Sequence, residues 1–385
     1  MKKIVFCLLC VLCGCSSSIN SDVTPTTAPL PTPTSTPDLE RHFSLVAVGD
    51  NLIHGAVYKA AYNASSDTYD FNDMYALVKP IVEPYDLAYV NLETLAAGQQ
   101  FGLSNYPNFN GPLEIIDGIV NAGFDWLSIS SNHSLDRGVE GIMSQTNYIR
   151  DHFNVITTGV NLSQKEANEY QVININGINV GLLGYTYGLN GHQLPQEYDY
   201  LINVLTKDKL VNDIYEISKI SDIQLVSVHW GDEYQYQPNQ YQKELALAAT
   251  KAGADVIVGT HPHVIQPLEI LRQDNGSETV VMYSLGNFLS AQDRAARMLE
   301  AMLQLDIGFN IQTKQHWFNS INVTPLINHV ENGWTYFQVT PWQDYDDSKV
   351  NSHTLTIQGE DMSREYLANI WNSVYPNYPI ESWDE

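Results

Sequence analysis

From Phe43 onward, short apolar runs alternate with amphipathic segments, which is the pattern of an α/β fold. The apolar runs predict strands at Phe43–Gly49, Leu87–Leu92, Trp126–Ser130, Val155–Thr157, Gln171–Asn176, Asn179–Tyr185, Leu225–His229, Val256–Gly259 and Val280–Ser284. The amphipathic segments predict helices at Leu113–Ala122, Val139–Phe153, Lys207–Ile220 and Gln240–Ala252. Because Asn176-Gly177 stands between two apolar runs, this dipeptide predicts a hairpin.

The pattern changes after Asn287, where strands follow one another without long helices between them. These later strands are predicted at Met302–Phe309, Ser320–Leu326 and Thr335–Val339, and a helix at Ser363–Ser373 closes the chain. No internal repeat is found in the sequence. We therefore expect one main domain over residues 41–345 and a C-terminal extension over residues 346–385.

The N-terminal segment is typical of an exported lipoprotein. Lys2 and Lys3 precede an apolar run, Ile4–Leu12, that is too short to span a bilayer. The run ends in Leu12-Cys13-Gly14-Cys15, which resembles the lipobox of bacterial lipoproteins. The resemblance implies a signal peptide over residues 1–15, a lipid on Cys15, and an extracytoplasmic protein anchored to the cell membrane. The alternative is an ordinary signal peptide with a chance cysteine.

Residues 16–40 carry five of the 17 prolines, interleaved with Ser and Thr, so we expect an extended linker there. The four cysteines all precede this linker, at positions 7, 10, 13 and 15. A disulfide framework and a cysteine-based metal site are therefore excluded for the folded part.

Composition narrows the class of function. The chain of 385 residues has 19 Lys and Arg against 44 Asp and Glu, a formal net charge of −25, which argues against a nucleic-acid partner. Hydrophobic residues make up 44% of the chain, enough for a full core, and charged residues only 16%. This balance excludes disorder of the whole chain, since disorder combines high charge with low apolar content.

Potential metal ligands follow strand after strand: Asp50, Glu93, Asn132-His133, His229 and His261 with His263. Because ligands bind at the carboxyl ends of strands in α/β sheets, these groups predict one mixed nitrogen and oxygen metal site. Such a set suits Mn, Fe or Zn, and the spacing does not choose among them.

Taken singly, these residues have structural alternatives: Asp50 could cap a helix, and His229 could be an ordinary buried histidine. The pair in Thr260-His261-Pro262-His263 is more specific, because the proline makes the turn that carries both imidazoles rigid. The spacing of His133 and Asp136 also allows the carboxylate to orient the imidazole.

Six ordered motifs make the chain recognisable: AVGDNLIH, VNLE, SNHSLDRG, VHWG, GTHPHVIQP and YSLGNF. This set resembles the bacterial CapA family, named for poly-γ-glutamate capsule synthesis, which is similar in turn to calcineurin-like metallophosphoesterases. The resemblance covers residues 43–290 at the level of motifs. It implies a metallophosphoesterase-like four-layer sandwich, in which two mixed β-sheets are flanked by helices and the metal centre lies at their edge.

The resemblance also implies roles for individual residues. The implied ligands of two divalent ions are Asp50, His54, Glu93, Asn132, His229, His261 and His263. His133 is the implied general acid, oriented by Asp136. Glu93 stands where metallophosphoesterases usually have a bridging Asp, which leaves the bridging geometry open.

Further residues are expected around the site, in contact with substrate rather than metal: Asn91, Trp230, Gln266 and Asn287. The segment YTYGLNG resembles a loop of the same family, in which Tyr187 and Asn190 would contact substrate. A glycine-rich hairpin that packs aromatic residues is an equal alternative for this segment.

If two metals bind, they would activate water and neutralise charge on a phosphoryl group, while His133 protonates the leaving oxygen. The sequence contains neither a GxSxG nucleophile motif nor a Walker-type GxxxxGK[ST] loop. Three functions stay open: a membrane-tethered factor of poly-γ-glutamate synthesis or export, working with a polymer synthase or export complex; an extracellular metal-dependent phosphoesterase unrelated to capsule; and a non-catalytic polymer-binding module.

Overall fold

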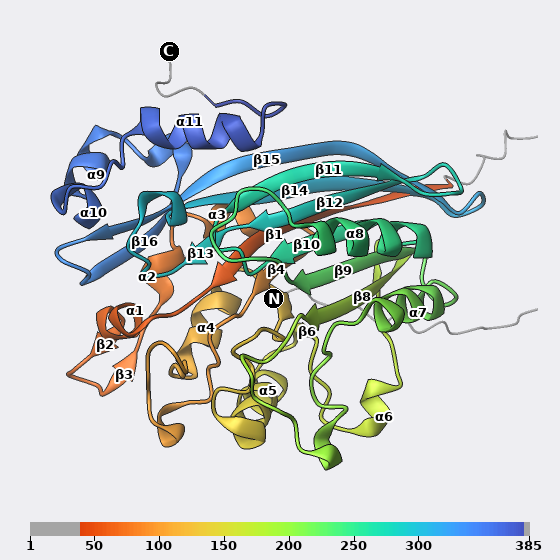
Figure 1. The fold of residues 1–385 in the computed structure, drawn as a ribbon, viewed down its shortest axis with the longest axis horizontal. Helices are drawn as coiled ribbons and strands as arrows, with labels where there is room; N and C mark the ends of the chain where they lie inside the picture. The colour runs from red at the N-terminus through yellow and green to blue at the C-terminus, as the bar shows by residue number, and fades with distance from the viewer. Residues whose placement is uncertain (1–38, 381–385) are drawn as a thin grey trace, which may run out of the picture. The chain divides into compact units, whose positions relative to one another are not determined.

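Two β-sheets pack face to face with helices outside them, in a computed structural model that describes residues 39–380 (Figure 1). The predicted signal peptide, the lipidation site Cys15 and the linker up to residue 38 lie outside the described residues. The described residues belong to one compact unit. Among them, no helix combines the length and the apolar character needed to cross a bilayer.

The first sheet has the order β16-β15-β14-β1-β4-β5-β6, and β13 pairs with β1. Its strands are β1 (Glu40–Asn51), β4 (Leu87–Asn91), β5 (Trp126–Ser128), β6 (Ile156–Thr158), β13 (Asn287–Leu289), β14 (Leu299–Asn310), β15 (Gln315–Glu331) and β16 (Tyr336–Pro341). β1 is parallel to β4 and antiparallel to β14, so the sheet is mixed. The carboxyl ends of β1, β4, β5 and β6 share one edge because these strands run parallel.

The second sheet has the order β11-β12-β10-β9-β8-β7. Its strands are β7 (Gln171–Ile175), β8 (Ile178–Thr186), β9 (Ile223–His229), β10 (Val256–Thr260), β11 (Ile265–Arg272) and β12 (Glu278–Leu285). β8, β9, β10 and β12 are parallel and almost entirely buried, which explains their nearly continuous apolar sequences. The predicted hairpin joins β7 to β8, and Asn176 and Gly177 both take the positive φ that a two-residue turn of this kind requires.

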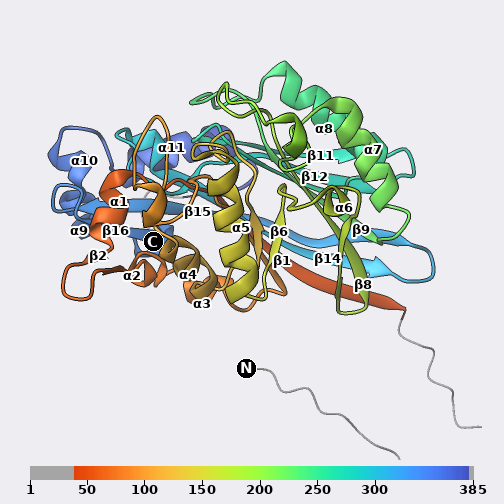
Figure 2. The same cartoon turned by 90° about the horizontal axis from the view of Figure 1, so that it is seen from below.

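Helices cover the outer faces of the sheets (Figures 1 and 2). α7 (Lys207–Ile217) and α8 (Gln240–Ala252) pack on the second sheet over a separate apolar cluster. α8 begins with a capping box between Asn239 and Gln242 and ends at Gly253, which has a left-handed backbone. α4 (Glu114–Asn121) and α5 (Gly138–His152) send their buried isoleucines into the main core beside the first sheet.

The remaining elements are short or peripheral. They are α1 (Gly55–Ala60), β2 (Tyr62–Asn63), β3 (Thr68–Tyr69), α2 (Asn72–Tyr75), α3 (Lys79–Val82), α6 (Gln164–Ala167), α9 (Asp347–Ser352), α10 (Thr354–Ile357) and α11 (Arg364–Val374), with four 3₁₀ turns at Gln99–Phe101, Gln196–Tyr198, Ala295–Arg297 and Trp342–Asp344. α11 is anchored in the same unit, since the Tyr375 hydroxyl at its end donates a 2.8 Å hydrogen bond to the Gln266 carbonyl.

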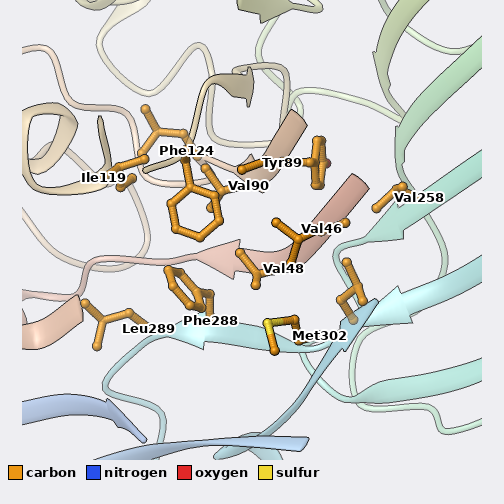
Figure 3. Packing of buried hydrophobic residues seen from close by; sticks show 14 of the residues in the cluster. Val46, Val48, Tyr89, Val90, Ile119, Phe124, Val258, Phe288, Leu289 and Met302 are labelled. Carbon is orange, nitrogen blue, oxygen red and sulfur yellow. The ribbon is translucent and has the colours of Figure 1, made fainter. Parts of the chain in front are cut away.

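The main core fills the space between the sheets. Figure 3 shows Val46 and Val48 of β1, Tyr89 and Val90 of β4, Val258 of β10, and Met302 of β14 in one apolar cluster. This packing holds the two sheets together directly behind the edge at which their parallel strands end. The chemistry described below therefore rests on a rigid double-sheet frame.

The predicted α/β fold with two mixed sheets and flanking helices is confirmed. Each predicted strand and helix is present, with ends that differ by a few residues. Strands β11 and β13 of the two large sheets, and the short pair β2 and β3, have no counterpart among the predicted strands. β11 contains Pro267, which weakens a strand pattern, and the structure tolerates this proline because β11 is an edge strand.

Candidate metal centre

Strands of both sheets deliver ionisable side chains to one buried place. Asp50 and Glu93 come from the first sheet, and His229 and His263 from the second. Glu93 Oε1 lies 3.7 Å from Nε2 of His229 and 3.7 Å from Nε2 of His263. Oδ2 of Asp50 lies 3.5 Å from Nδ1 of His263, and Oδ1 of Asp50 lies 3.7 Å from Nδ1 of His229. The strand-end residues predicted to converge do converge.

Asp50 is fixed by hydrogen bonds to both sheets. Its Oδ1 accepts a 2.7 Å bond from Nδ2 of Asn91, and its Oδ2 accepts a 3.0 Å bond from the backbone N–H of His261. The backbone around it is close-packed, since a Cβ on Gly49 would stand 2.0 Å from the carbonyl oxygen of Gly286. Only glycine lets β1 approach the turn at Gly286, and this approach places Asp50 at the sheet edge.

The turn Thr260-His261-Pro262-His263 holds two imidazoles in an unfavourable backbone geometry. His261 has φ +99° and His263 has φ +58°, and a positive φ is uncommon for any residue other than glycine. Nδ1 of His263 lies 3.0 Å from Oδ1 of Asn287, while Nδ1 of His261 is buried without a hydrogen-bond partner. Strain of this kind is maintained where a side chain must point into a site.

Glu93 is the clearest sign that a cation belongs here. Both of its carboxylate oxygens are buried, and neither has a hydrogen-bond partner among residues 39–380. One ligand atom from each of Glu93, His261 and His263 lies within 4.8 Å of the others, a spacing that suits a single ion. Burial, followed by the charges of Asp50 and Glu233, raises the pKa of Glu93 well above its usual value. A bound cation would remove this penalty, so the residues fit a divalent metal.

Burial favours the neutral, metal-ligating form of three imidazoles, those of His229, His261 and His54. Burial lowers the pKa of His229 well below its usual value, and the neighbouring His261 and His263 lower it further. Burial also lowers the pKa of His261 to about 3 and that of His54 to about 4. Neutral rings at neutral pH keep a lone pair free for a metal without the release of a proton.

The loop after β5 supplies the predicted amide and acid. Oδ1 of Asn132 lies 2.9 Å from Nε2 of His229, and Nδ2 of Asn132 donates a 3.2 Å bond to Oδ1 of Asn190. Nδ1 of His133 lies 2.7 Å from Oδ2 of Asp136, which also accepts a 2.6 Å bond from the backbone N–H of Phe109. Because Asp136 holds Nδ1–H, Nε2 is the His133 nitrogen that can exchange a proton.

His54 lies at the margin of this cluster. It occupies the N-cap position of α1, and its Nδ1 lies 3.0 Å from the Leu52 carbonyl oxygen and 3.2 Å from the Ala291 backbone nitrogen. Its ring packs edge-on against Phe109. The structure thus places His54 beside the site, and no contact within 4 Å joins it to Asp50 or Glu93 among the described ion pairs.

The residues expected around the site divide into two groups. Asn91 hydrogen-bonds Asp50, and Asn287 lies within hydrogen-bond distance of His263. The ring centroids of Tyr187 and His261 lie 4.6 Å apart. Trp230 and Gln266 are instead fully buried and satisfied by other partners. The Trp230 indole donates to the Tyr283 carbonyl, and the Gln266 amide bonds Gln242 and the Gln235 carbonyl. The structure does not bring these two side chains to the open side of the centre.

Two further residues of the centre were missed by sequence reasoning. Thr260 Oγ1 lies 2.9 Å from Nδ1 of His229 and so fixes that ring. The Tyr234 ring lies 5.9 Å from that of His263. The position of Thr260 directly before His261 was an available signal. Tyr234 carried none, because a tyrosine in a polar loop is indistinguishable from an ordinary surface residue.

A family model and two relatives of known name all point to bacterial capsule synthesis proteins. The family model described as bacterial capsule synthesis protein PGA_cap matches residues 44–292. The PGA biosynthesis protein CapA of Bacillus subtilis (strain 168) is 30% identical over 292 residues, which cover 73% of this chain and 70% of that protein. The capsule biosynthesis protein CapA of Bacillus anthracis is 29% identical over 202 residues, which cover 51% of this chain and 47% of that protein.

Solved structures also align with this chain. The calcineurin-like phosphoesterase YfkN from Bacillus subtilis aligns over 88% of this chain and 98% of its own, with a TM-score of 0.43 and 13% identity. The NAD nucleotidase NadN of Haemophilus influenzae aligns over 82% of this chain and 63% of its own, with a TM-score of 0.49 and 11% identity.

Proposed function

This chain belongs to the family of bacterial capsule synthesis proteins, and from that premise we propose that it acts in the synthesis or export of a cell-surface polymer through a metal-dependent hydrolytic site. The observation that carries the proposal is Glu93, a buried carboxylate without a hydrogen bond that lies among His229, His261 and His263. Because burial raises the pKa of Glu93, the ionised carboxylate is favoured there only when a cation lies beside it.

Divalent ions would be held by the side chains that meet at the sheet edge: Asp50, Glu93, Asn132, His229, His261 and His263, with His54 at the margin. Bound there, Mn, Fe or Zn would supply Lewis acidity for the attack of water on a phosphoryl group. The protein contributes orientation, since Asn91, Thr260 and Asn287 each fix one of these ligands through a hydrogen bond.

His133 is the proton donor of the proposed reaction. Asp136 holds the proton on Nδ1, so Nε2 gives up its proton only when the ring is charged. In hydrolysis of a phosphoester, the oxygen of water bonds to phosphorus and the bond to the leaving oxygen breaks. The leaving oxygen takes the proton from Nε2, and a proton of the attacking water restores the ring.

The polymer and the anchor are further parts of the proposal. The Bacillus subtilis relative is named as a PGA biosynthesis protein, so we propose poly-γ-glutamate as the polymer. We also propose that a lipid on Cys15 tethers the chain to the outer side of the cell membrane. Labelling of cells with a palmitate analogue tests the anchor: the wild type should carry label and stay with membranes, and Cys15→Ala should lose both properties.

The metal site is tested by elemental analysis of the purified full-length chain. The wild type should retain Mn, Fe or Zn through gel filtration, and the double variant His261→Ala, His263→Ala should lose it. His152→Ala is the matched control, because His152 is an exposed histidine at the end of α5. Equal metal content in the double variant and the wild type would remove the proposed site.

Activity is tested separately with a panel of phosphodiesters and added Mn²⁺. Turnover that requires both the metal and Glu93 supports the hydrolase. Tight metal binding with no turnover on any phosphodiester would contradict it and would favour a module that only binds polymer.

A further inference from the structure

The loop that follows β9 folds back over the metal centre. Tyr234 in this loop has φ +64°, an unfavourable conformation for an aromatic residue. Its backbone N–H donates a 2.7 Å hydrogen bond to the Pro262 carbonyl, between the two histidines of the turn. The buried amide of Gln266 holds the same loop through the Gln235 carbonyl. The surrounding hydrogen bonds therefore hold Tyr234 at this place in a backbone conformation that costs free energy.

Tyr234 lies at the exposed margin of the site. The side chain is 38% exposed, and its ring centroid lies 5.9 Å from that of His263. The guanidinium carbon of Arg297 also lies over this ring, 3.7 Å from its centroid. Of the cation–ring contacts among residues 39–380, this is the one whose ring also lies against a histidine of the centre.

Arg297 is tied to the centre a second time through its backbone. Nδ2 of Asn287 donates a 3.1 Å hydrogen bond to the Arg297 carbonyl, while Oδ1 of the same Asn287 lies 3.0 Å from His263. The side chain remains partly available, since within the described residues its guanidinium makes one long hydrogen bond of 3.4 Å, to the exposed Asp293. A guanidinium carries five N–H donors, so several are left for a ligand.

Arg297 is a positive charge in a strongly acidic protein, and this bears on how an anionic substrate could bind. The centre contains Asp50, Glu93 and Asp136, with Glu233 close enough to raise the pKa of Glu93. The whole chain carries a formal charge of −25. An anionic substrate would be repelled from such a surface unless a cation receives it.

We propose that Arg297, stacked on Tyr234, binds an anionic group of the substrate that lies next to the group held at the metal centre. The inference rests on the proposed function and adds the substrate class, a molecule with two anionic groups a short spacer apart. The second group is a carboxylate or a phosphate, because the planar guanidinium binds both through paired hydrogen bonds.

Calorimetric titration of the Mn²⁺-loaded full-length chain tests the inference with three non-hydrolysable probes. Methylphosphonate has one anionic group, phosphonopropionate adds a carboxylate, and ethylene bisphosphonate adds a second phosphonate. Arg297→Gln should weaken binding of at least one dianionic probe by about tenfold or more, and leave methylphosphonate within about twofold. The probe that responds identifies the second group.

Two controls make the result specific. Arg294→Gln removes the same charge three residues away, where Arg294 pairs with Glu360, and should leave all three affinities unchanged. Arg297→Lys keeps the charge without the planar fork and should recover part of the affinity.

Equal losses for all three probes, or none, in Arg297→Gln would overturn the inference while the metal centre stands. Probe binding that is unchanged when Mn²⁺ is omitted would instead overturn the proposed function. If no probe binds the metal-loaded wild type, both are overturned.

Discussion

Several residues of the centre are held in states that cost the folded protein stability. Leaving a buried polar group without a hydrogen bond costs about 1–3 kcal/mol, and Glu93 has two such oxygens. The positive φ angles of Tyr234, His261 and His263 cost on the order of 1–3 kcal/mol each. These costs fall within one small region of the molecule. Their combination at a cluster of buried ionisable side chains is what a binding or catalytic centre requires.

His133 gives the first prediction at the residue scale. His133→Gln removes the group that exchanges a proton at Nε2, so turnover of a phosphodiester should fall by about 10²–10⁴-fold. Metal content should stay at the wild-type level, because His133 contacts Asp136 and Phe109 rather than Glu93. The assay compares kcat of the variant with that of His152→Gln as control. Unchanged turnover in His133→Gln would remove the general-acid role.

Asp125 gives a prediction on pH and stability away from the centre. Burial raises the pKa of Asp125 from 3.8 to about 6, although the Ala88 N–H, which donates a 2.8 Å bond to Oδ1, partly opposes this. Below pH 4 the carboxyl is protonated in the folded and the unfolded chain, so it has no effect on the free energy of unfolding. Between pH 4 and 6 only the unfolded chain ionises, so wild-type stability falls, and above pH 6 the loss is constant.

Asp125→Asn keeps an acceptor for the Ala88 N–H and cannot ionise. The variant should therefore gain stability relative to wild type as pH rises from 4 to 6, reaching on the order of 2 kcal/mol at pH 7. Urea unfolding at pH 4, 5, 6 and 7 measures the difference, and the pair at pH 4 serves as the internal control. A difference that is the same at every pH would contradict the raised pKa.

At the scale of elements, the strands could be predicted because buried parallel strands leave nearly continuous apolar runs in the sequence. The convergence of Asp50, Glu93 and the histidines followed from their positions directly after those runs. Whether a side chain beside a ligand faces the site or the core could not be read in this way. Trp230 follows His229 immediately, yet it turns into the core toward Tyr283.

The approach of separate loops was equally hidden from the sequence. Tyr234 and Arg297 lie in different parts of the chain and meet only because Asn287 and the Pro262 carbonyl hold their loops. The signals for such contacts are tertiary hydrogen bonds, which no local pattern of apolar and polar residues contains. The sequence therefore predicted the candidate ligands that follow the strands, but not the neighbouring residues Tyr234 and Arg297.

Gly49 gives the prediction at this scale, because it sets how closely β1 approaches the turn before β13. Gly49→Ala would place a methyl group 2.0 Å from the Gly286 carbonyl oxygen, so β1 or the turn must move. We expect a loss of about 3 kcal/mol or more in the free energy of unfolding, together with loss of bound metal, because Asp50 moves with the strand.

Gly188→Ala is the matched control for this change. Apart from its two chain neighbours, no described residue has a heavy atom within 4 Å of a Cβ at that position, and its φ is not in the left-handed region. Thermal unfolding of both variants measures the contrast. Midpoints within a degree or two of each other would show that the close approach at Gly49 does not constrain the sheet edge.

At the scale of the whole molecule, the centre joins the two sheets. Asp50 lies near the end of β1 and Glu93 follows β4 in the first sheet, while His229 ends β9 and His261 and His263 follow β10 in the second. An ion held between these groups crosslinks the halves of the sandwich. It also offsets part of the negative charge, which in a chain of net charge −25 opposes compact folding.

A metal that binds the folded chain and not the unfolded chain should therefore raise the thermal midpoint in a concentration-dependent way. At one hundred times its dissociation constant the gain is about 2.7 kcal/mol in the free energy of unfolding. Calorimetry of the chelator-treated full-length chain with increasing Mn²⁺ measures the rise. Glu93→Gln keeps the size of the side chain and removes its charge, so the variant should lose most of the response to Mn²⁺. In chelator it should also unfold at a higher temperature than the wild type, because Gln has no carboxyl group whose ionisation is disfavoured by burial in the folded chain. An equal rise in both proteins would mean that Mn²⁺ acts on the acidic surface in general, and the two sheets would then not be linked through Glu93.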